Sequence, residues 1–221
     1  MHIYLKNIAK AYKENAVIKD APAMEAYMKN HFKFYGLKSP LRNEITKSHM
    51  LQYGKVSYED MEQVVFDAYA QPYRELHYFA MTLLETHKKN LQEKDIELVK
   101  YMVLNNSWWD TVDYIATRGA GELIKKYPSL IEVMDEWSTH ENMWLRRIAI
   151  LHQMKYKSKT DTKRLFSYCI KNAKDKEFFI QKAMGWALRE YAYVDANAVL
   201  DFVANHTLPN LTVREAKKHF K

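Results

Sequence analysis

The sequence has few residues that interrupt helices or cross-link a chain. Only five glycines, five prolines and one cysteine occur among its 221 residues. The single cysteine, Cys169, excludes an internal disulfide, and no Cys/His set with metal-ligand spacing lies near it, so we expect it to be a small buried apolar residue. Because breakers are scarce and Ala, Leu, Lys, Glu and Met are abundant, long helices with short connections are expected.

Long hydrophobic runs are also absent. No stretch of about 18 apolar residues occurs, and residues 1–6 lack the continuous apolar segment of a secretory signal. These absences predict a cytoplasmic protein with no membrane partner. His31, His77 and His152 are scattered without ligand spacing, so the sequence predicts no metal site and no organic cofactor.

Positive charge is concentrated in the C-terminal third. The whole chain has 34 Lys and Arg against 27 Asp and Glu, a net charge of +7. Residues 145–221 hold 16 basic and 7 acidic residues, whereas residues 1–144 hold 18 and 20. Such asymmetry indicates a polyanionic partner such as nucleic acid, whose phosphates attract a basic surface and release counterions on binding. Charge alone is weak evidence, because many basic proteins bind no DNA.

A helical pattern covers most of the chain, and no polar–apolar alternation is long enough for a β-strand. Ser39 before Pro40, Ser57 before two acidic residues and Asp175 before Glu177 are typical of helix starts. The expected helices span residues 2–14, 22–32, 40–52, 58–71, 73–88, 94–104, 108–126, 129–138, 142–155, 161–173, 177–191, 196–205 and 211–220.

The helix starts recur at a regular interval. Glu75, Trp109, Trp144 and Phe179 begin similar units, at spacings of 34, 35 and 35 residues. Periods of this length indicate stacked helical hairpins, because one helix pair cannot bury its apolar face alone. The sequence therefore predicts an all-α, helical-hairpin repeat solenoid with a concave basic groove, as a single domain of residues 1–221. The units are only weakly similar, so a plain helical bundle remains an alternative.

Two tryptophans lie beside two carboxylates in Trp108-Trp109-Asp110 and the following Asp113. Trp109 and Asp113 are four residues apart, so they share one face of a helix. An aromatic face attracts positive charge and a carboxylate stabilises it, which suits a cationic, planar ligand. The alternative is that the tryptophans belong to the core and the aspartates mark a helix start.

The repeat places further residues in the same register. Counted from each unit start as zero, Trp109 is at 0, Arg147 at +3, Asp113 at +4, Trp186 at +7 and Arg189 at +10. These positions fall along one side of a helix, so three neighbouring helices would present them to one surface. Taken singly, the indole at +7 also fits core packing, and each arginine fits a solvated helix charge.

Four blocks of the chain resemble the DNA alkylation repair enzymes built of HEAT-like repeats, often called AlkD-type alkylpurine DNA glycosylases. The resemblance covers the chain from about residue 20 to its end. The blocks are Tyr27-Met28-Lys29-Asn30-His31-Phe32, Ser107-Trp108-Trp109-Asp110 with Val112-Asp113, Trp144-Leu145-Arg146-Arg147 with Ala149-Ile150-Leu151, and Lys176-Glu177-Phe178-Phe179-Ile180-Gln181-Lys182-Ala183 with Gly185-Trp186 and Leu188-Arg189-Glu190-Tyr191.

The resemblance implies an enzyme that removes purines alkylated at N3 or N7, such as 3-methyladenine and 7-methylguanine, from double-stranded DNA. It implies a catalytic aspartate at Asp113, catalytic indoles at Trp109 and Trp186, a groove arginine at Arg147 and a motif tyrosine at Tyr27. It also implies that the lesion stays in or near the duplex stack, unlike the extruded base of most glycosylases.

Phosphate contacts are expected from Arg147, whose forked donors can hold two oxygens, and from basic residues further along the chain. No lysine is assigned to Schiff-base chemistry, so the expected product is an abasic site without strand cleavage. A groove that encloses duplex DNA is compatible with a monomer. The further DNA-binding residues expected are Lys182, Arg189, Arg214, Lys217 and Lys218.

Two other functions fit the same sequence. Helical repeats are commonly interaction platforms, so a scaffold that binds damaged DNA or protein without catalysis is the first alternative. The second is a binder of damaged DNA that has lost the hydrolytic step. Only the enzyme would release free alkylated base from DNA, so this measurement distinguishes it from both alternatives.

Overall fold

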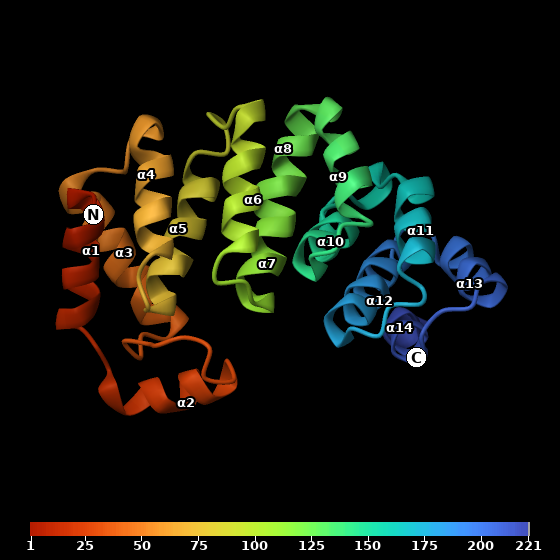
Figure 1. Cartoon of the computed structure of the whole chain (residues 1–221), viewed down its shortest axis with the longest axis horizontal. Helices are drawn as coiled ribbons and strands as arrows, with labels where there is room; N and C mark the ends of the chain where they lie inside the picture. Colours follow the sequence, from red (N-terminus) through yellow and green to blue (C-terminus); the bar gives the residue numbers. More distant parts are fainter. Residues whose placement is uncertain (221) are drawn as a thin grey trace. The chain divides into compact units, whose positions relative to one another are not determined.

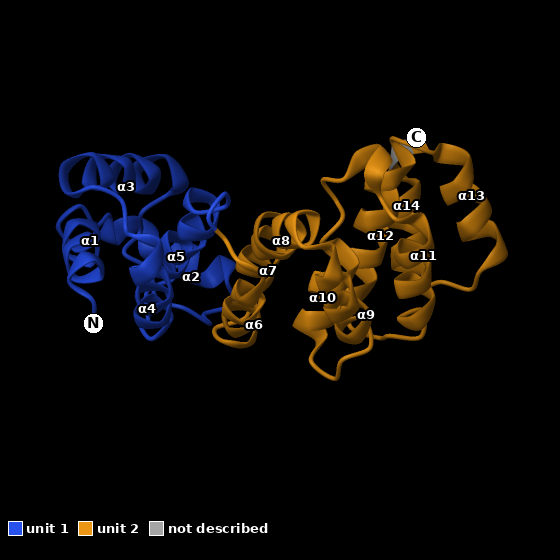
Figure 2. Ribbon diagram, turned by 90° about the horizontal axis from the view of Figure 1, so that it is seen from above, with its two compact units in different colours: residues 1–90 blue, residues 91–221 orange. Residues whose placement is uncertain are grey.

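The fold is all-helical, as predicted. The computed structural model describes residues 1–220, and over that range the one extended pairing is an isolated bridge between Lys33 and Tyr73. The contacts divide the chain into two compact units, residues 1–90 and 91–221 (Figure 2). Lys221, which the predicted domain includes, lies outside the described residues. None of the described helices is long and apolar enough to cross a membrane.

The first unit is built from five α-helices and one short 3-10 turn. Its last helix, α5, is amphipathic, since buried apolar residues recur at helical spacing. These residues are Leu76, Phe79, Ala80, Leu83 and Leu84. The helices are α1 (Ile3–Glu14), α2 (Ala21–Tyr27), α3 (Ser39–Tyr53), α4 (Tyr58–Tyr69) and α5 (Arg74–Thr86), with the 3-10 turn η1 (Ile18–Asp20) before α2.

Several expected helix boundaries in the first unit differ from the structure, by five residues at the end of α2 and by one or two residues elsewhere. The helix expected over 22–32 ends at Tyr27, because Lys29 and Asn30 adopt left-handed backbone conformations with φ of 55° and 59°. The helix expected from Pro40 begins at Ser39, since proline is also tolerated at the second position of the first turn. Ser57 caps α4 as expected, accepting a hydrogen bond from the backbone N–H of Asp60 at 3.0 Å.

The second unit holds the remaining helices. The segment expected as one helix over 108–126 is α7, a π-helical turn and α8 in succession, and the helix expected over 142–155 ends at Leu151. The α-helices are α6 (Ile96–Leu104), α7 (Trp109–Ile115), α8 (Gly121–Lys126), α9 (Ile131–Trp137), α10 (Met143–Leu151), α11 (Thr162–Lys171), α12 (Phe178–Ala192), α13 (Ala196–Asn205) and α14 (Asn210–Ala216). The shorter turns are η2 (Glu93–Asp95), η3 (Ala116–Ala120), η4 (Pro128–Leu130), η5 (Lys157–Lys159) and η6 (Lys217–Phe220).

The helical repeat is confirmed by helix starts and by packing. The helices α5, α7, α10 and α12 begin at Arg74, Trp109, Met143 and Phe178, close to the predicted unit starts. Within the second unit, α7 contacts α10, α10 contacts α12 and α12 contacts α14 (Figure 1). The helices α7, α10, α12 and α14 therefore pack each against the next in this order. Cys169 on α11 is free and fully buried, as expected.

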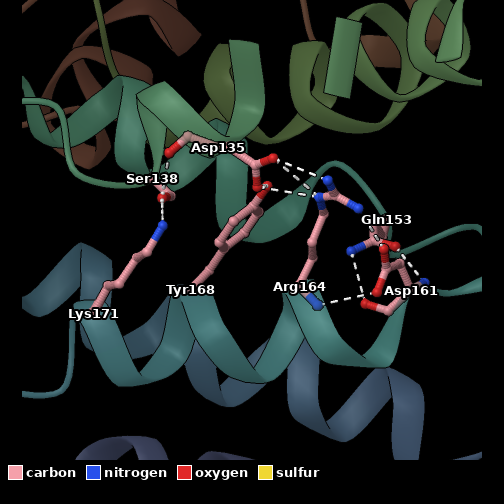
Figure 3. A network of polar contacts seen from close by, with 7 residues as sticks. All are labelled: Asp135, Ser138, Gln153, Asp161, Arg164, Tyr168 and Lys171. Carbon is pink, nitrogen blue, oxygen red and sulfur yellow. Dashed lines mark hydrogen bonds and ion pairs between the residues drawn. The ribbon is translucent and has the colours of Figure 1, made fainter. Parts of the chain in front are cut away.

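A polar network holds α11 against α9 (Figure 3). Asp135 on α9 accepts hydrogen bonds from Arg164 Nη2 at 3.0 Å and from the Tyr168 hydroxyl at 2.7 Å. Lys171 Nζ donates to Ser138 Oγ at 3.2 Å. The side chains of the Arg164–Asp135 ion pair are each about one-third exposed. We therefore expect this pair to orient α11 and to add at most about 1 kcal/mol of stability.

Candidate active site

The site begins with an ion pair between neighbouring repeats. Arg147 on α10 donates from Nε to Oδ1 of Asp113 on α7 at 2.6 Å and from Nη2 to Oδ2 at 2.7 Å. Its Nη1 donates to the backbone carbonyl of Phe179 on α12. The arginine side chain is 1% exposed and the aspartate side chain 25% exposed. The carboxylate is therefore the member of the pair that a ligand can reach.

Burial and the arginine have opposite effects on Asp113. Burial raises the pKa of its carboxyl above the ordinary value, and the hydrogen bonds and charge of Arg147 oppose that rise, whereas nearby Asp110 adds to it. The two-pronged contact also fixes the direction of both carboxylate oxygens. An oriented carboxylate with little bulk water around it can stabilise positive charge strongly.

Aromatic rings border this ion pair. The ring centroids of Trp108, Trp144 and Phe179 lie 5.1 to 5.9 Å from one another. The guanidinium carbon of Arg147 lies 5.7 Å from the centroid of the Phe179 ring. Sequence reasoning missed this cluster. The shared repeat position of Trp144 and Phe179 was the available signal, but it indicated only that both residues begin a unit.

Trp186 on α12 lies beside the same arginine. The centroid of its indole is 5.3 Å from the guanidinium carbon of Arg147 and 5.3 Å from Lys182 Nζ. The side chain is half-buried, and its Nε1 donates to Oε2 of Glu215 at 3.2 Å. The structure thus connects predicted residues from three successive repeats: Asp113, Arg147 and Trp186.

A second acid, Glu215 on α14, contacts three of the predicted DNA-binding residues and was not itself predicted. Its Oε1 accepts from Lys182 and Lys218 at 2.8 Å each, and Arg189 Nη1 lies 3.4 Å from Oε2. Burial by itself raises the pKa of Glu215, but the hydrogen bonds and charges of the two lysines lower it to about 2. The only sequence signal was one acid within the basic stretch 214–218.

The other predicted residues have different surroundings. Trp109 is the half-buried first residue of α7, one turn before Asp113. Arg214 and Lys217 are exposed, on α14 and in the turn that follows it. Tyr27 ends α2 in the first compact unit and is 68% exposed.

The forked donors of Arg147 bind a carboxylate in this structure. Sequence reasoning expected the forked donors to hold two phosphate oxygens, whereas here they hold the two oxygens of Asp113. Because the guanidinium is almost completely buried, a direct phosphate contact requires a change of conformation. In this structure the arginine orients the carboxylate.

Stacked helix pairs, in which a buried arginine of one repeat holds a partly exposed carboxylate of the repeat before it, define a helical-repeat protein. The family model described as "DNA alkylation repair enzyme" matches residues 8–220. The chain therefore belongs to the DNA alkylation repair enzyme family, and DNA is the partner that this membership implies.

Solved structures agree with this assignment. The chain is similar to a predicted DNA alkylation repair enzyme from Enterococcus faecalis, with 29% identity, a TM-score of 0.84 and coverage of 91% of this chain and 94% of that one. Two proteins of Streptococcus mutans share the fold. They are smu.31 of strain UA159 (16% identity, TM-score 0.66, coverage 97% and 98%) and AlkD2 (19%, 0.62, 80% and 88%). A comparison with curated proteins gave no match.

Proposed function

We propose that the protein is a monofunctional DNA glycosylase that hydrolyses the N-glycosidic bond of cationic N3- and N7-alkylated purines in double-stranded DNA. The observation that supports this most is the partly exposed Asp113 carboxylate, held by buried Arg147 in a chain of the DNA alkylation repair family. We propose that the chain acts as a monomer and a single domain, with DNA in a concave basic groove along its repeats.

The departing alkylated base needs little catalytic assistance. A purine alkylated at N3 or N7 already bears positive charge, which weakens the glycosidic bond without a strong general acid. The remaining charge develops on the sugar as the bond breaks. Asp113 near C1′ would stabilise that oxocarbenium-like transition state and orient the attacking water. Donors and charges placed in this way contribute about 3 kcal/mol, or about 100-fold in rate.

Trp109 and Trp186 would form an aromatic cleft around the deoxyribose and the lesion. A cation over an indole gains about 0.5 to 2 kcal/mol, and a neutral base lacks this interaction. The cleft would therefore favour charged lesions over normal purines. We propose that the lesion reacts in or near the duplex stack, without extrusion of the base.

Cationic side chains would hold the DNA backbone. Lys182, Arg189 and Lys218 are partly exposed around Glu215, and phosphate contacts from such groups set position rather than sequence preference. Arg214, Lys217 and Tyr27 are the other proposed contacts. With no lysine assigned to Schiff-base chemistry, the product is an abasic site on an intact strand.

The decisive experiment compares base release by the wild type and by Asp113→Asn. Duplex DNA methylated at purine N7 and N3 is incubated with each protein, and free 7-methylguanine and 3-methyladenine are measured. We expect release by the wild type and a loss of at least about 100-fold in the variant, with DNA binding retained. Asp201→Asn is the matched control, because it makes the same change at an exposed position on α13.

The alternatives give different results. A scaffold or a damage binder releases no base even as the wild type, although the damage binder still prefers methylated DNA. Base release that persists in Asp113→Asn would show an active glycosylase whose charge-stabilising group is a different residue.

A further inference from the structure

A buried acid, Glu215, binds three cationic side chains and the indole of Trp186. The Glu215 side chain is 2% exposed, whereas its three cationic partners, Lys182, Arg189 and Lys218, reach solvent. One carboxylate therefore fixes the positions of three positive charges, and the cluster keeps a net positive charge. The same carboxylate accepts the indole N–H of Trp186.

Glu215 on α14 can contact these α12 side chains because α12 and α14 approach each other closely at Gly185. A Cβ atom at Gly185 on α12 would lie 2.4 Å from Cβ of Glu215 and 2.9 Å from the backbone oxygen of Thr212 on α14. The Thr212 hydroxyl in turn donates to the backbone oxygen of Gln181 at 2.9 Å. This close approach lets the Glu215 side chain reach Nε1 of Trp186, the residue that follows Gly185 in the chain.

Stability alone does not account for this charge. Exchanging buried ionic groups for apolar residues of similar volume is often neutral or stabilising, because desolvation offsets the attraction. The carboxylate instead fixes the orientation of the side chains that it binds. A hydrogen bond to Nε1 restricts rotation of the indole, and the bond to Lys182 holds a cation 5.3 Å from the same ring.

We propose that Glu215 is a positioning residue that sets the orientation of Trp186 and holds Lys182 and Arg189 beside it. A lesion and its neighbouring phosphate would then meet a preformed surface, and no side chain would have to be ordered when DNA binds. This inference rests on the proposed glycosylase function, because it concerns the same site.

The test is a spectroscopic and kinetic comparison of Glu215→Gln with the wild type. The indole N–H resonance of Trp186 is identified in a ¹⁵N–¹H spectrum as the one missing from Trp186→Phe. We expect Glu215→Gln to move this resonance, since a neutral amide replaces the carboxylate acceptor. We also expect a fall of about tenfold in the single-turnover rate on methylated DNA.

A double-mutant cycle shows whether Glu215 acts through Trp186. In a Trp186→Phe background, we expect Glu215→Gln to reduce the rate further by less than about twofold. Fully independent effects, or an unmoved Trp186 resonance, would overturn the proposal. Glu215→Asp is the second variant if the glutamine protein does not fold, because it keeps the charge but shortens the reach to the indole.

Glu75→Gln is the matched control. Glu75 is a fully buried glutamate in the first unit, where it accepts the backbone N–H of Leu37 at 3.1 Å. We expect this variant to leave the Trp186 resonance in place. If the wild type releases no base, the proposed function fails, whereas the resonance still reports whether Glu215 positions the indole.

Discussion

Asp113 and Arg147 lie 34 residues apart in the sequence and meet through two hydrogen bonds. Their repeat positions, +4 and +3, placed both on one side of their helices. The two side chains meet because α7 packs against α10, which the sequence spacing alone does not specify. A buried guanidinium needs an anionic partner, and the nearest carboxylate of the preceding repeat supplies it.

Removal of the arginine should change the pH dependence of catalysis. In Arg147→Met, Asp113 loses the partner that opposes the effect of burial, so the pKa of Asp113 rises further above its ordinary value. The carboxyl is then neutral up to a higher pH, and activity is lost at low pH and regained as the pH rises. We expect the acidic limb of the single-turnover profile to move to higher pH.

Arg146→Met is the control for this shift. Arg146 lies on the same helix and pairs with Asp175 at 2.9 Å, with both side chains mostly buried. Its removal takes away a comparable ion pair and one positive charge, so some stability is lost. The acidic limb should stay in place. A limb that moves equally in both variants would indicate that overall charge, and not contact with Asp113, causes the shift.

The close packing of α12 and α14 depends on one glycine. In Gly185→Ala, the added methyl group meets Cβ of Glu215 and the backbone of Thr212, and backbone atoms cannot rotate away. We expect α14 to move outward and the free energy of unfolding to fall by about 1 to 3 kcal/mol. Denaturant unfolding measures this loss of stability. Relative to the wild type, amide hydrogen exchange should accelerate more in α14 than in α9. Unchanged exchange in α14 would contradict this account.

Helix ends were harder to predict than helices. The long apolar patterns identified most helices of both units, yet the helix expected over 22–32 ends five residues early, at Tyr27. Nothing in the local pattern of Lys29 and Asn30 excludes a helix. They leave it because the following segment is held elsewhere, with Lys33 and Leu37 bonded to the region around α5. Such long-range hydrogen bonds override local propensity.

The stability of the whole molecule should depend on His152, a histidine at the end of α10 that is not part of the site. His152 is fully buried, and burial lowers its pKa from 6.5 to about 4. Between these values the unfolded chain binds a proton that the folded chain excludes, so stability is complete above pH 6.5 and is lost as the pH falls towards 4. We expect His152 to account for up to about 3 kcal/mol of that loss.

Urea unfolding at several pH values in this range, for the wild type and for His152→Gln, measures that contribution. The imidazole nitrogen Nδ1 contacts the backbone carbonyl of Ala149 at 2.7 Å, and the glutamine amide can replace it as a donor. The variant should lose less stability than the wild type between pH 6.5 and 4. Parallel curves for the two proteins would show that the loss comes from other groups.

The sequence by itself determined the helical class, the 34- to 35-residue repeat and the side of each helix on which Asp113, Arg147 and Trp186 lie. Periodicity specifies these features, because a helix of 3.6 residues per turn sorts its own side chains into faces. Only the tertiary structure decided the partners. Arg147 binds the carboxylate of Asp113, and Glu215 binds Lys182, Arg189 and Lys218. Burial gives charged groups partners on neighbouring helices, and spacing along one chain does not specify which helix approaches most closely.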